Sequence, residues 1–148
     1  PSFDRLRGYQ TALEAHGITF DAGLVENTEF TFDGGYTAAR LLLERPDATA
    51  RPTAIFSGND EAGFGVLYAA QELGWVVPAQ LSICGYDDFA LSKFVWPGLT
   101  TIHQPAEELL DLAARLLIHL VKGEPVESRQ VIVQPQLVIR GSTSALPR

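Results

Sequence analysis

Six polar residues that follow apolar segments of the sequence have side chains suited to binding a polyol. They supply carboxylates, carboxamides and an imidazole: Asn59, Asp60, Asp87, Asp88, His103 and Gln104. A carboxylate accepts hydrogen bonds from two hydroxyl groups at once, whereas an amide both donates and accepts them. An arginine adds several donors in one plane, and an aromatic ring suits the apolar side of a sugar. The residue types of a sugar site are therefore present.

Each acidic residue also has an ordinary structural role open to it. Asp60 is placed to cap the helix that starts there, and Asp88 is placed to cap a short turn through Phe89 to Ser92. For Asp87, solvation in a loop and ligand binding both remain open. A fixed charge at the mouth of a buried strand is costly unless a partner pairs with it, so the partner of Asp87 is the central question.

The pattern of apolar residues predicts the elements that position these side chains. Helices are expected from Ser2 to His16, from a cap at Asp33 to residue 43, from 59 to 73 and from 105 to 121. Strands are expected at 24–25, 53–57, 81–84, 99–102 and 130–140, the last at a sheet edge or bulge because Pro135 has no N–H.

This alternation of strands and helices predicts an α/β fold. Strands that are apolar throughout indicate a doubly wound, mostly parallel sheet with helices on both faces. In open sheets of this kind, ligands bind beyond the carboxyl ends of the strands. The polar residues lie at those ends.

Composition excludes several classes of protein. The 148 residues and 46% hydrophobic content suit a single globular domain, and no apolar stretch approaches the ~20 residues that span a bilayer. The 11 basic and 18 acidic residues give a net charge of −7, which repels nucleic acid phosphates.

Cys84 is the only cysteine and is expected to be a small buried hydrophobe. The opening Pro-Ser, with no methionine anywhere, predicts part of a longer protein, and no signal peptide pattern is visible.

Nothing in the sequence points to catalysis, a metal or a cofactor. His16, His103 and His119 lack ligands at metal spacing, and no phosphate-binding loop or nucleophile elbow is present. The adjacent carboxylates would point apart on extended backbone. A hydrolase and a phosphate-accepting receiver domain are the alternatives of another class. The receiver needs an acidic pair after the first strand, where only Glu26 is found, and a lysine near a late strand, whereas Lys93 is expected in a loop.

Longer motifs resemble the lactose-repressor/galactose-repressor (LacI/GalR) family of bacterial transcription regulators. They are SGNDEAGFGVLYAAQELGWVVPAQLSICGYDD at 57–88 and PGLTTIHQP at 97–105, followed by a long apolar helix. R-x-x-G-Y at Arg5 and FTFDGGY at 30–36 extend the resemblance over nearly the whole chain.

The resemblance implies a periplasmic-binding-protein-like type I fold with two α/β subdomains and an effector held between them. Residues 1–104 and 124–148 would belong to the carboxyl-terminal subdomain. Residues 105–123 would be a helix of the amino-terminal subdomain, which is otherwise missing together with a helix-turn-helix domain. The apolar arc of that helix should then be bare or covered by another copy of the chain, and a homodimer is expected.

The resemblance also implies roles for five residues. Arg5 would reach the effector, Phe30 would stack on it, Asn59 and Asp87 would hydrogen-bond its hydroxyls, and Gln104 would lie near the crossover. Core packing remains an alternative for Phe30, and hinge packing for Gln104. Asp87 would be paired by ligand hydroxyls and by Arg5, whereas Asp88 would be structural.

The function implied is that of a cytoplasmic, sugar-responsive transcriptional regulator. Its small-molecule effector would close the subdomains, and operator DNA would be contacted only through the missing domain, with no membrane partner. The alternative is an extracytoplasmic sugar-binding protein of a transporter, which would need a signal peptide upstream. The match of SICGYDD and TTIHQP favours the regulator.

Overall fold

A computed structural model describes residues 2–126, 128 and 130–145. The helices are α1 (Ser2–Ala15), α2 (Phe32–Leu43), α3 (Asp60–Glu72) and α4 (Ala106–Lys122). The strands are β1 (Ala54–Phe56), β2 (Ser82–Cys84), β3 (Thr101–His103) and β4 (Gln136–Val138). Short 3₁₀ turns are η1 (Ala22–Leu24), η2 (Ala48–Ala50) and η3 (Ala90–Lys93).

The predicted α/β architecture with parallel strands is confirmed. β1 pairs with β2 in parallel register, and a parallel bridge between Cys84 and Thr100 extends the pairing toward β3. β4 runs antiparallel to β3. The last strand is much shorter than the predicted 130–140, and Pro135 lies directly before it, where its missing N–H costs no ladder hydrogen bond.

Two local predictions were wrong. The segment at Leu24 and Val25 is not a strand, because the Asp21 carboxylate accepts a hydrogen bond from the Gly23 N–H and starts the turn η1. The cap of α2 is Thr31, whose hydroxyl accepts from the Gly34 N–H. Asp33, the predicted cap, instead lies in the first turn of that helix.

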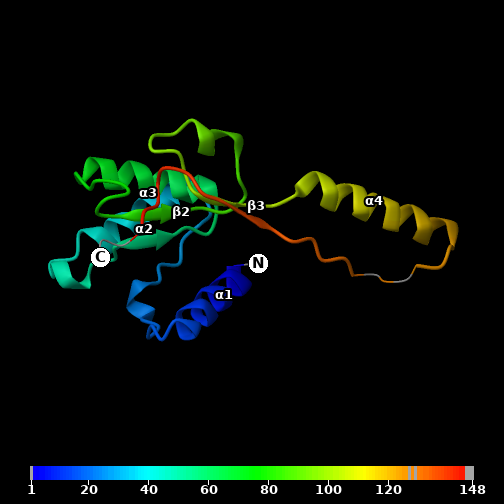
Figure 1. Cartoon of the computed structure of the whole chain (residues 1–148), viewed down its shortest axis with the longest axis horizontal. Coiled ribbons are helices and arrows are strands. Elements are labelled where there is room, and N and C mark those ends of the chain that lie inside the picture. Colours follow the sequence, from blue (N-terminus) through cyan, green and yellow to red (C-terminus); the bar gives the residue numbers. More distant parts are fainter. Residues whose placement is uncertain (1, 127, 129, 146–148) are drawn as a thin grey trace.

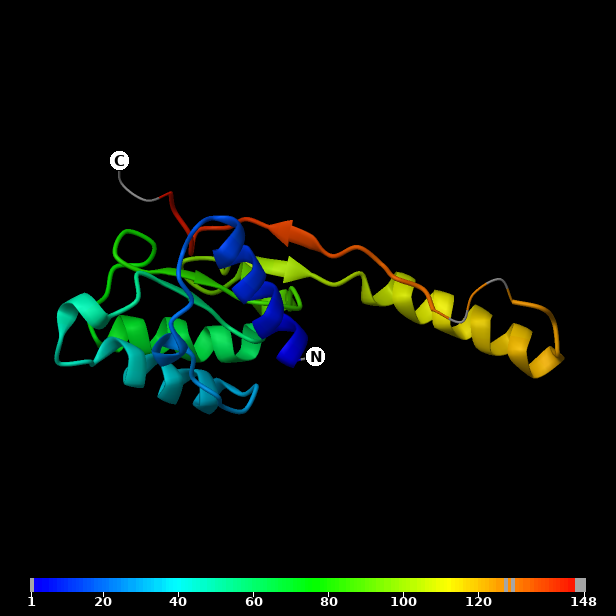
Figure 2. The same ribbon diagram turned by 90° about the horizontal axis from the view of Figure 1, so that it is seen from below.

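The core lies between α2, α3 and the parallel strands. Its fully buried side chains include Leu43, Leu81, Ile83 and Leu99. The two helices approach closely at glycines, since a Cβ on Gly35 would strike the Ala62 carbonyl and one on Gly65 would strike the Phe32 carbonyl. Figures 1 and 2 show α2 and α3 side by side along β1 and β2, with α1 standing apart from them.

The strand β1 is less buried than its apolar sequence predicted. Phe56 is 43% exposed and Ala54 is also exposed. Among the described residues β1 pairs only with β2, so it forms an edge of the sheet. Its outer side faces a cavity of about 1080 Å³ that separates it from α1.

The helix α4 extends away from the rest of the molecule, as Figures 1 and 2 show. It has no buried residue although its sequence is strongly amphipathic. Leu110 is 69% exposed, Leu117 61% and Val121 81%. The expected bare apolar face is therefore present, and we call these three residues with Leu109, Ile118 and Leu120 the α4 apolar face.

Candidate binding site

The carboxyl ends of β1, β2 and β3 meet at one edge of the molecule. Backbone hydrogen bonds from the Ser57 N–H to the Cys84 carbonyl (2.8 Å) and from the Gly85 N–H to the Thr100 carbonyl (2.8 Å) align the segments that leave the strands. A parallel bridge joins Asp87 to His103. The sequence-based prediction that the polar residues converge is thus confirmed.

Asp87 and Gln104 are in direct contact. The Gln104 Nε2 donates a hydrogen bond of 2.5 Å to Asp87 Oδ1, and the Asp87 N–H donates to the Ile102 carbonyl at 2.9 Å. Asp87 has a φ of 115°, which non-glycine residues rarely adopt. Such strain persists only where surrounding contacts impose it, and it gathers at functional sites.

Arg5 brings α1 to the same edge. Its guanidinium donates a hydrogen bond to the Gly58 carbonyl and lies 5.5 Å from the centroid of the Phe30 ring. It forms no ion pair with Asp87 among the described residues, so the predicted pairing of those two side chains is not present. Arg5 nevertheless contacts the polar edge, because Gly58 directly precedes Asn59 in the segment that follows β1.

The Phe30 ring lies at the surface of this edge. It packs against Gly58, where a Cβ would clash with the ring, and remains 42% exposed. Core burial, the alternative role considered for Phe30, does not describe this position. An exposed aromatic face beside a guanidinium can contact the apolar side of a ligand ring.

The Asn59 side chain is occupied within the protein. Its Oδ1 accepts from the Ala62 N–H at 3.0 Å and makes Asn59 the cap of α3, while its Nδ2 donates to the Phe30 carbonyl at 3.0 Å. Asn59 is 8% exposed. One amide N–H and one acceptor position of Oδ1 are left for a ligand. The prediction that Asp60 caps this helix was wrong by one position.

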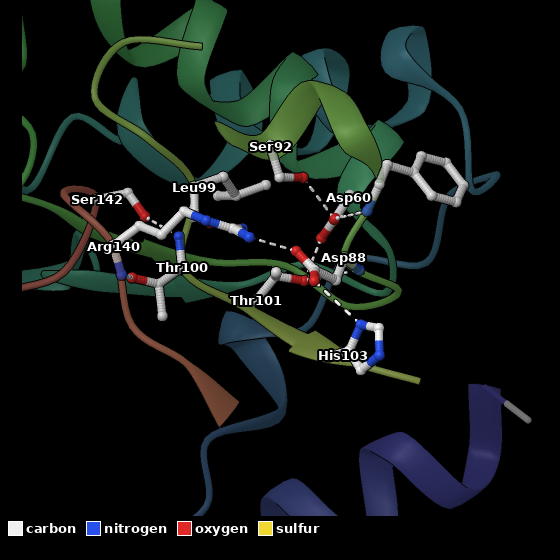
Figure 3. Close-up of polar contacts among 10 residues, drawn as sticks. Asp60, Asp88, Ser92, Leu99, Thr100, Thr101, His103, Arg140 and Ser142 are labelled. Atoms are coloured by element: carbon white, nitrogen blue, oxygen red, sulfur yellow. Dashed lines mark hydrogen bonds and ion pairs between the residues drawn. The ribbon is translucent and has the colours of Figure 1, made fainter. Parts of the chain in front are cut away.

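Asp60 instead forms a buried hydrogen-bond centre that sequence reasoning missed. The carboxylate is fully buried and accepts from the Phe89 N–H (2.8 Å), the Ser92 hydroxyl (2.6 Å) and the Thr101 hydroxyl (2.5 Å). Figure 3 shows Ser92 and Thr101 beside Asp60. A buried carboxylate is tolerated because three donors from two other segments satisfy it.

The Asp88 carboxylate is held by the side chains of Arg140 and His103. The Arg140 Nη2 lies 2.5 Å from one carboxylate oxygen and the His103 Nδ1 lies 3.0 Å from the other (Figure 3). Burial raises the pKa of Asp88, but hydrogen bonds and charge from Arg140, aided by His103, outweigh it and hold the pKa below its usual value. Asp88 does not cap η3, whose cap is Phe89. Its predicted structural role agrees with these contacts.

The other candidate groups lie apart from one another. His16 contacts the Ala12 carbonyl and His119 pairs with Glu124, so with His103 the three histidines occupy separate places. Within the described ranges, no cluster of three potential metal ligands occurs.

Burial, together with the nearby charge of Asp60, raises the pKa of the Cys84 thiol to about 11, so the thiol is protonated at neutral pH. None of the helices of the described chain has both the length and the apolar character needed to cross a bilayer.

The cavity beside β1 is distinct from the polar edge. Aliphatic and aromatic side chains dominate its lining, among them Leu6, Tyr9, Leu42 and Ile55. It reaches the polar edge at Arg5, Phe30, Ser57 and Gly58, whereas Asn59, Asp87 and Gln104 are not in its lining. Polar and charged side chains, among them Glu26, Asn27 and Arg51, make up the rest of the lining.

Comparison with known proteins finds bacterial repressors among the relatives of this chain. Residues 1–143 match the family of periplasmic binding protein-like domains. The chain is 39% identical over 142 residues to the ribose operon repressor of Escherichia coli strain K12, and 41% identical over 143 residues to the HTH-type transcriptional repressor CytR of that strain. These matches cover 96% and 97% of the chain but only 42% and 41% of the repressors, so the chain spans less than half of their length.

A solved structure with a bound sugar has the same fold. The LacI family transcriptional regulator from Enterococcus faecium, with bound ribose, superposes with a TM-score of 0.87 at 31% identity. The match covers 99% of this chain and 53% of that one. By its match over residues 1–143, the chain belongs to the family of periplasmic binding protein-like domains, and it is similar to regulators of the LacI family.

Proposed function

We propose that this chain forms one wall of the sugar-binding cleft of a transcriptional regulator. The observation that carries the proposal is the placement of Asp87. Its carboxylate stands on strained backbone at the convergent strand ends, with one oxygen bonded to Gln104 and no cation paired to it among the residues that the structure describes. A half-buried carboxylate with unused acceptor capacity is suited to hydroxyl donors.

The neighbouring side chains provide the complementary chemistry. Arg5 has five N–H donors, of which one is used by the Gly58 carbonyl, so several can reach a ligand oxygen. The Phe30 ring offers an apolar face, and Asn59 contributes one amide N–H. Gln104 orients Asp87 and lies two residues before α4, at the start of the crossover.

The names of the relatives support a regulator over the alternatives. One relative is named a ribose operon repressor and another an HTH-type transcriptional repressor, and the Enterococcus faecium regulator holds ribose. This favours a regulator over a transporter's binding protein or an enzyme. With a net charge of −7, the chain itself is unsuited to DNA, so we assign operator binding to a helix-turn-helix domain outside it and the whole protein to the cytoplasm. An effector would switch that protein only by binding its two states with different affinity.

The division of the chain between two lobes is part of this proposal. Residues 1–104 and 124–148 would form one lobe, and residues 105–123 would pack in a second lobe that the chain otherwise lacks. The exposed α4 apolar face supports this division, because leucines at helical spacing are rarely left in water.

We also propose that the whole protein is a homodimer. The segment after η3 exposes Phe94 (79%) and Trp96 (93%), which are large side chains typical of protein interfaces. Sedimentation velocity of the full-length protein should give a dimer at micromolar concentration. A monomer at that concentration would contradict this assignment.

Calorimetry of the full-length protein with D-ribose and a panel of other pentoses, hexoses and disaccharides tests the proposed site. Asp87→Asn keeps the size of the side chain and tolerates a positive φ, but removes the charge. We expect it to weaken sugar binding at least about tenfold, the cost of a hydrogen bond to a charged group. Asp47→Asn, in the exposed cap of η2, is the matched control and should bind normally. Equal affinity of both variants and the unaltered protein would refute the site.

A further inference from the structure

Tyr86 lies directly against Arg5. The guanidinium carbon of Arg5 is 4.0 Å from the centroid of the Tyr86 ring, closer than to the Phe30 ring at 5.5 Å. With the bond from Arg5 to the Gly58 carbonyl, two aromatic faces and one acceptor hold the guanidinium. A cation this close to an aromatic face is attracted to it electrostatically.

The backbone of Tyr86 is fixed on both sides. Its carbonyl accepts from the Asp60 N–H at 2.8 Å, and the next residue, Asp87, donates to the Ile102 carbonyl at 2.9 Å. The Tyr86 ring is therefore carried by a backbone segment that is hydrogen-bonded to Asp60 and to Ile102. In contrast, the Tyr86 hydroxyl has no hydrogen-bond partner among the described residues. The structural contribution of this side chain resides in its ring.

Arg5 needs such a platform because of where it lies. It belongs to α1, which stands apart from α2 and α3 across the cavity (Figures 1 and 2). A free arginine side chain has about 2 kcal/mol of rotamer entropy, which binding must overcome. A guanidinium already held in place loses less of it, so a preorganised arginine binds a ligand more tightly.

We propose that Tyr86 is a positioning residue for the sugar site, whose aromatic face holds the Arg5 guanidinium at the carboxyl ends of the strands. The inference rests on the proposed function, since it assigns Arg5 to the ligand. It predicts that the ring is required and the hydroxyl is not. It also predicts that Tyr86 acts only through Arg5.

The placement of Arg5 can be measured without any ligand. In full-length protein with ¹⁵N-labelled arginine, the Arg5 Nε–H signal, assigned with Arg5→Lys, should carry a ring-current shift. Tyr86→Phe should keep that shift and Tyr86→Leu should remove most of it. An unchanged Arg5 signal in Tyr86→Leu would overturn the inference whether or not a sugar binds.

The effect on binding is tested by calorimetry with D-ribose, or with the panel sugar that binds the unaltered protein most tightly. Tyr86→Phe should bind within about twofold of the unaltered protein, and Tyr86→Leu should bind about 5- to 30-fold more weakly, the range of a cation–π contact. Tyr68→Leu, which removes an exposed tyrosine of α3 packed on Phe32 and Tyr36, is the control for loss of an aromatic ring.

A double-mutant cycle separates positioning from a general loss of structure. In the Arg5→Ala background, Tyr86→Leu should cause no further loss of affinity, because the residue to be positioned is gone. Equal losses in both backgrounds, or a Tyr86→Phe variant as weak as Tyr86→Leu, would overturn the inference. If no panel sugar binds the unaltered protein, the proposed function is refuted instead. The ring-current experiment would still decide whether Tyr86 positions Arg5, because it needs no ligand.

Discussion

Arg140 clamps Asp88 across 52 positions of sequence, with Nη2 2.5 Å from Oδ1. Both side chains are nearly buried, at 13% and 11% exposed. The same arginine donates from Nη1 to the Leu99 carbonyl at 2.8 Å. These contacts join the segment after β4 to the loop after β2, which contains Asp87 and Asp88. Asp88 itself has a φ of 59°. The proposed ligand residue thus stands next to a fixed anchor.

Removing this anchor should destabilise the fold. Arg140→Met keeps much of the apolar stem but leaves the nearly buried Asp88 carboxylate with only His103. We expect the free energy of unfolding, measured in urea, to fall by about 3–5 kcal/mol, the usual cost of breaking a buried ion pair. Arg115→Met, which breaks the exposed pair with Asp111, is the control and should leave stability nearly unchanged. Similar midpoints for both variants would contradict the clamp.

The pH dependence of stability should report on Asp88. Its pKa is lower in the folded protein than its usual value, so its contribution to stability is complete above the unfolded pKa of about 3.9 and is lost as the pH falls through the folded pKa. The stability difference between unaltered protein and Asp88→Asn should therefore shrink as the pH is lowered from about 5 toward 3. Parallel pH profiles would argue against a lowered pKa, and Asp111→Asn serves as an exposed control.

Gly85 should be essential to the buried Asp60 centre. A Cβ at this position would collide with the Asp60 carboxylate and meet Leu99 Cδ2 at 3.0 Å. We expect Gly85→Ala to lower the free energy of unfolding by about 1–3 kcal/mol. Gly8→Ala is the matched control, because nothing lies within 4 Å of its added Cβ in α1, and it should stabilise by about 0.4–1 kcal/mol. Equal effects of the two substitutions would show that the Asp60 centre is not tightly packed.

The α4 apolar face should matter only in the longer protein. Leu117 is 61% exposed, so Leu117→Asp should change the unfolding free energy of the 148-residue chain by no more than about 0.5 kcal/mol. In the full-length protein, where we propose that a second lobe covers this face, the same substitution should lower the thermal midpoint clearly, because it buries a charge. A similarly small effect in both proteins would contradict the proposed division into lobes.

The edge where the site lies could be predicted from sequence, because it follows from local patterns. Apolar runs marked the parallel strands, and strand polarity alone brings Asn59, Asp87 and Gln104 to one edge. Glycines and prolines set most helix ends within one or two residues. Capping at Asn59 rather than Asp60 was a shift of one residue that propensity does not resolve, since both residue types cap well.

The role of Asp60 could not be predicted, since it depends on hydroxyls 32 and 41 positions away in Ser92 and Thr101. Those contacts arise only once the strands are side by side. The expectation of extended backbone at Asp87 and Asp88 also failed, because both have positive φ and turn toward Gln104 and Arg140 respectively. Gly85, where a Cβ would collide with the Asp60 carboxylate, is the local hint that another segment approaches closely here.

A crystal structure of the full-length protein with its tightest-binding panel sugar tests the central claim most directly. The account predicts a sugar hydroxyl within about 2.6–3.2 Å of the Asp87 carboxylate, a second oxygen at the same range from the Arg5 guanidinium, and the sugar ring against Phe30. A sugar seated in the apolar cavity beside β1, or elsewhere without contact to Asp87, would contradict it.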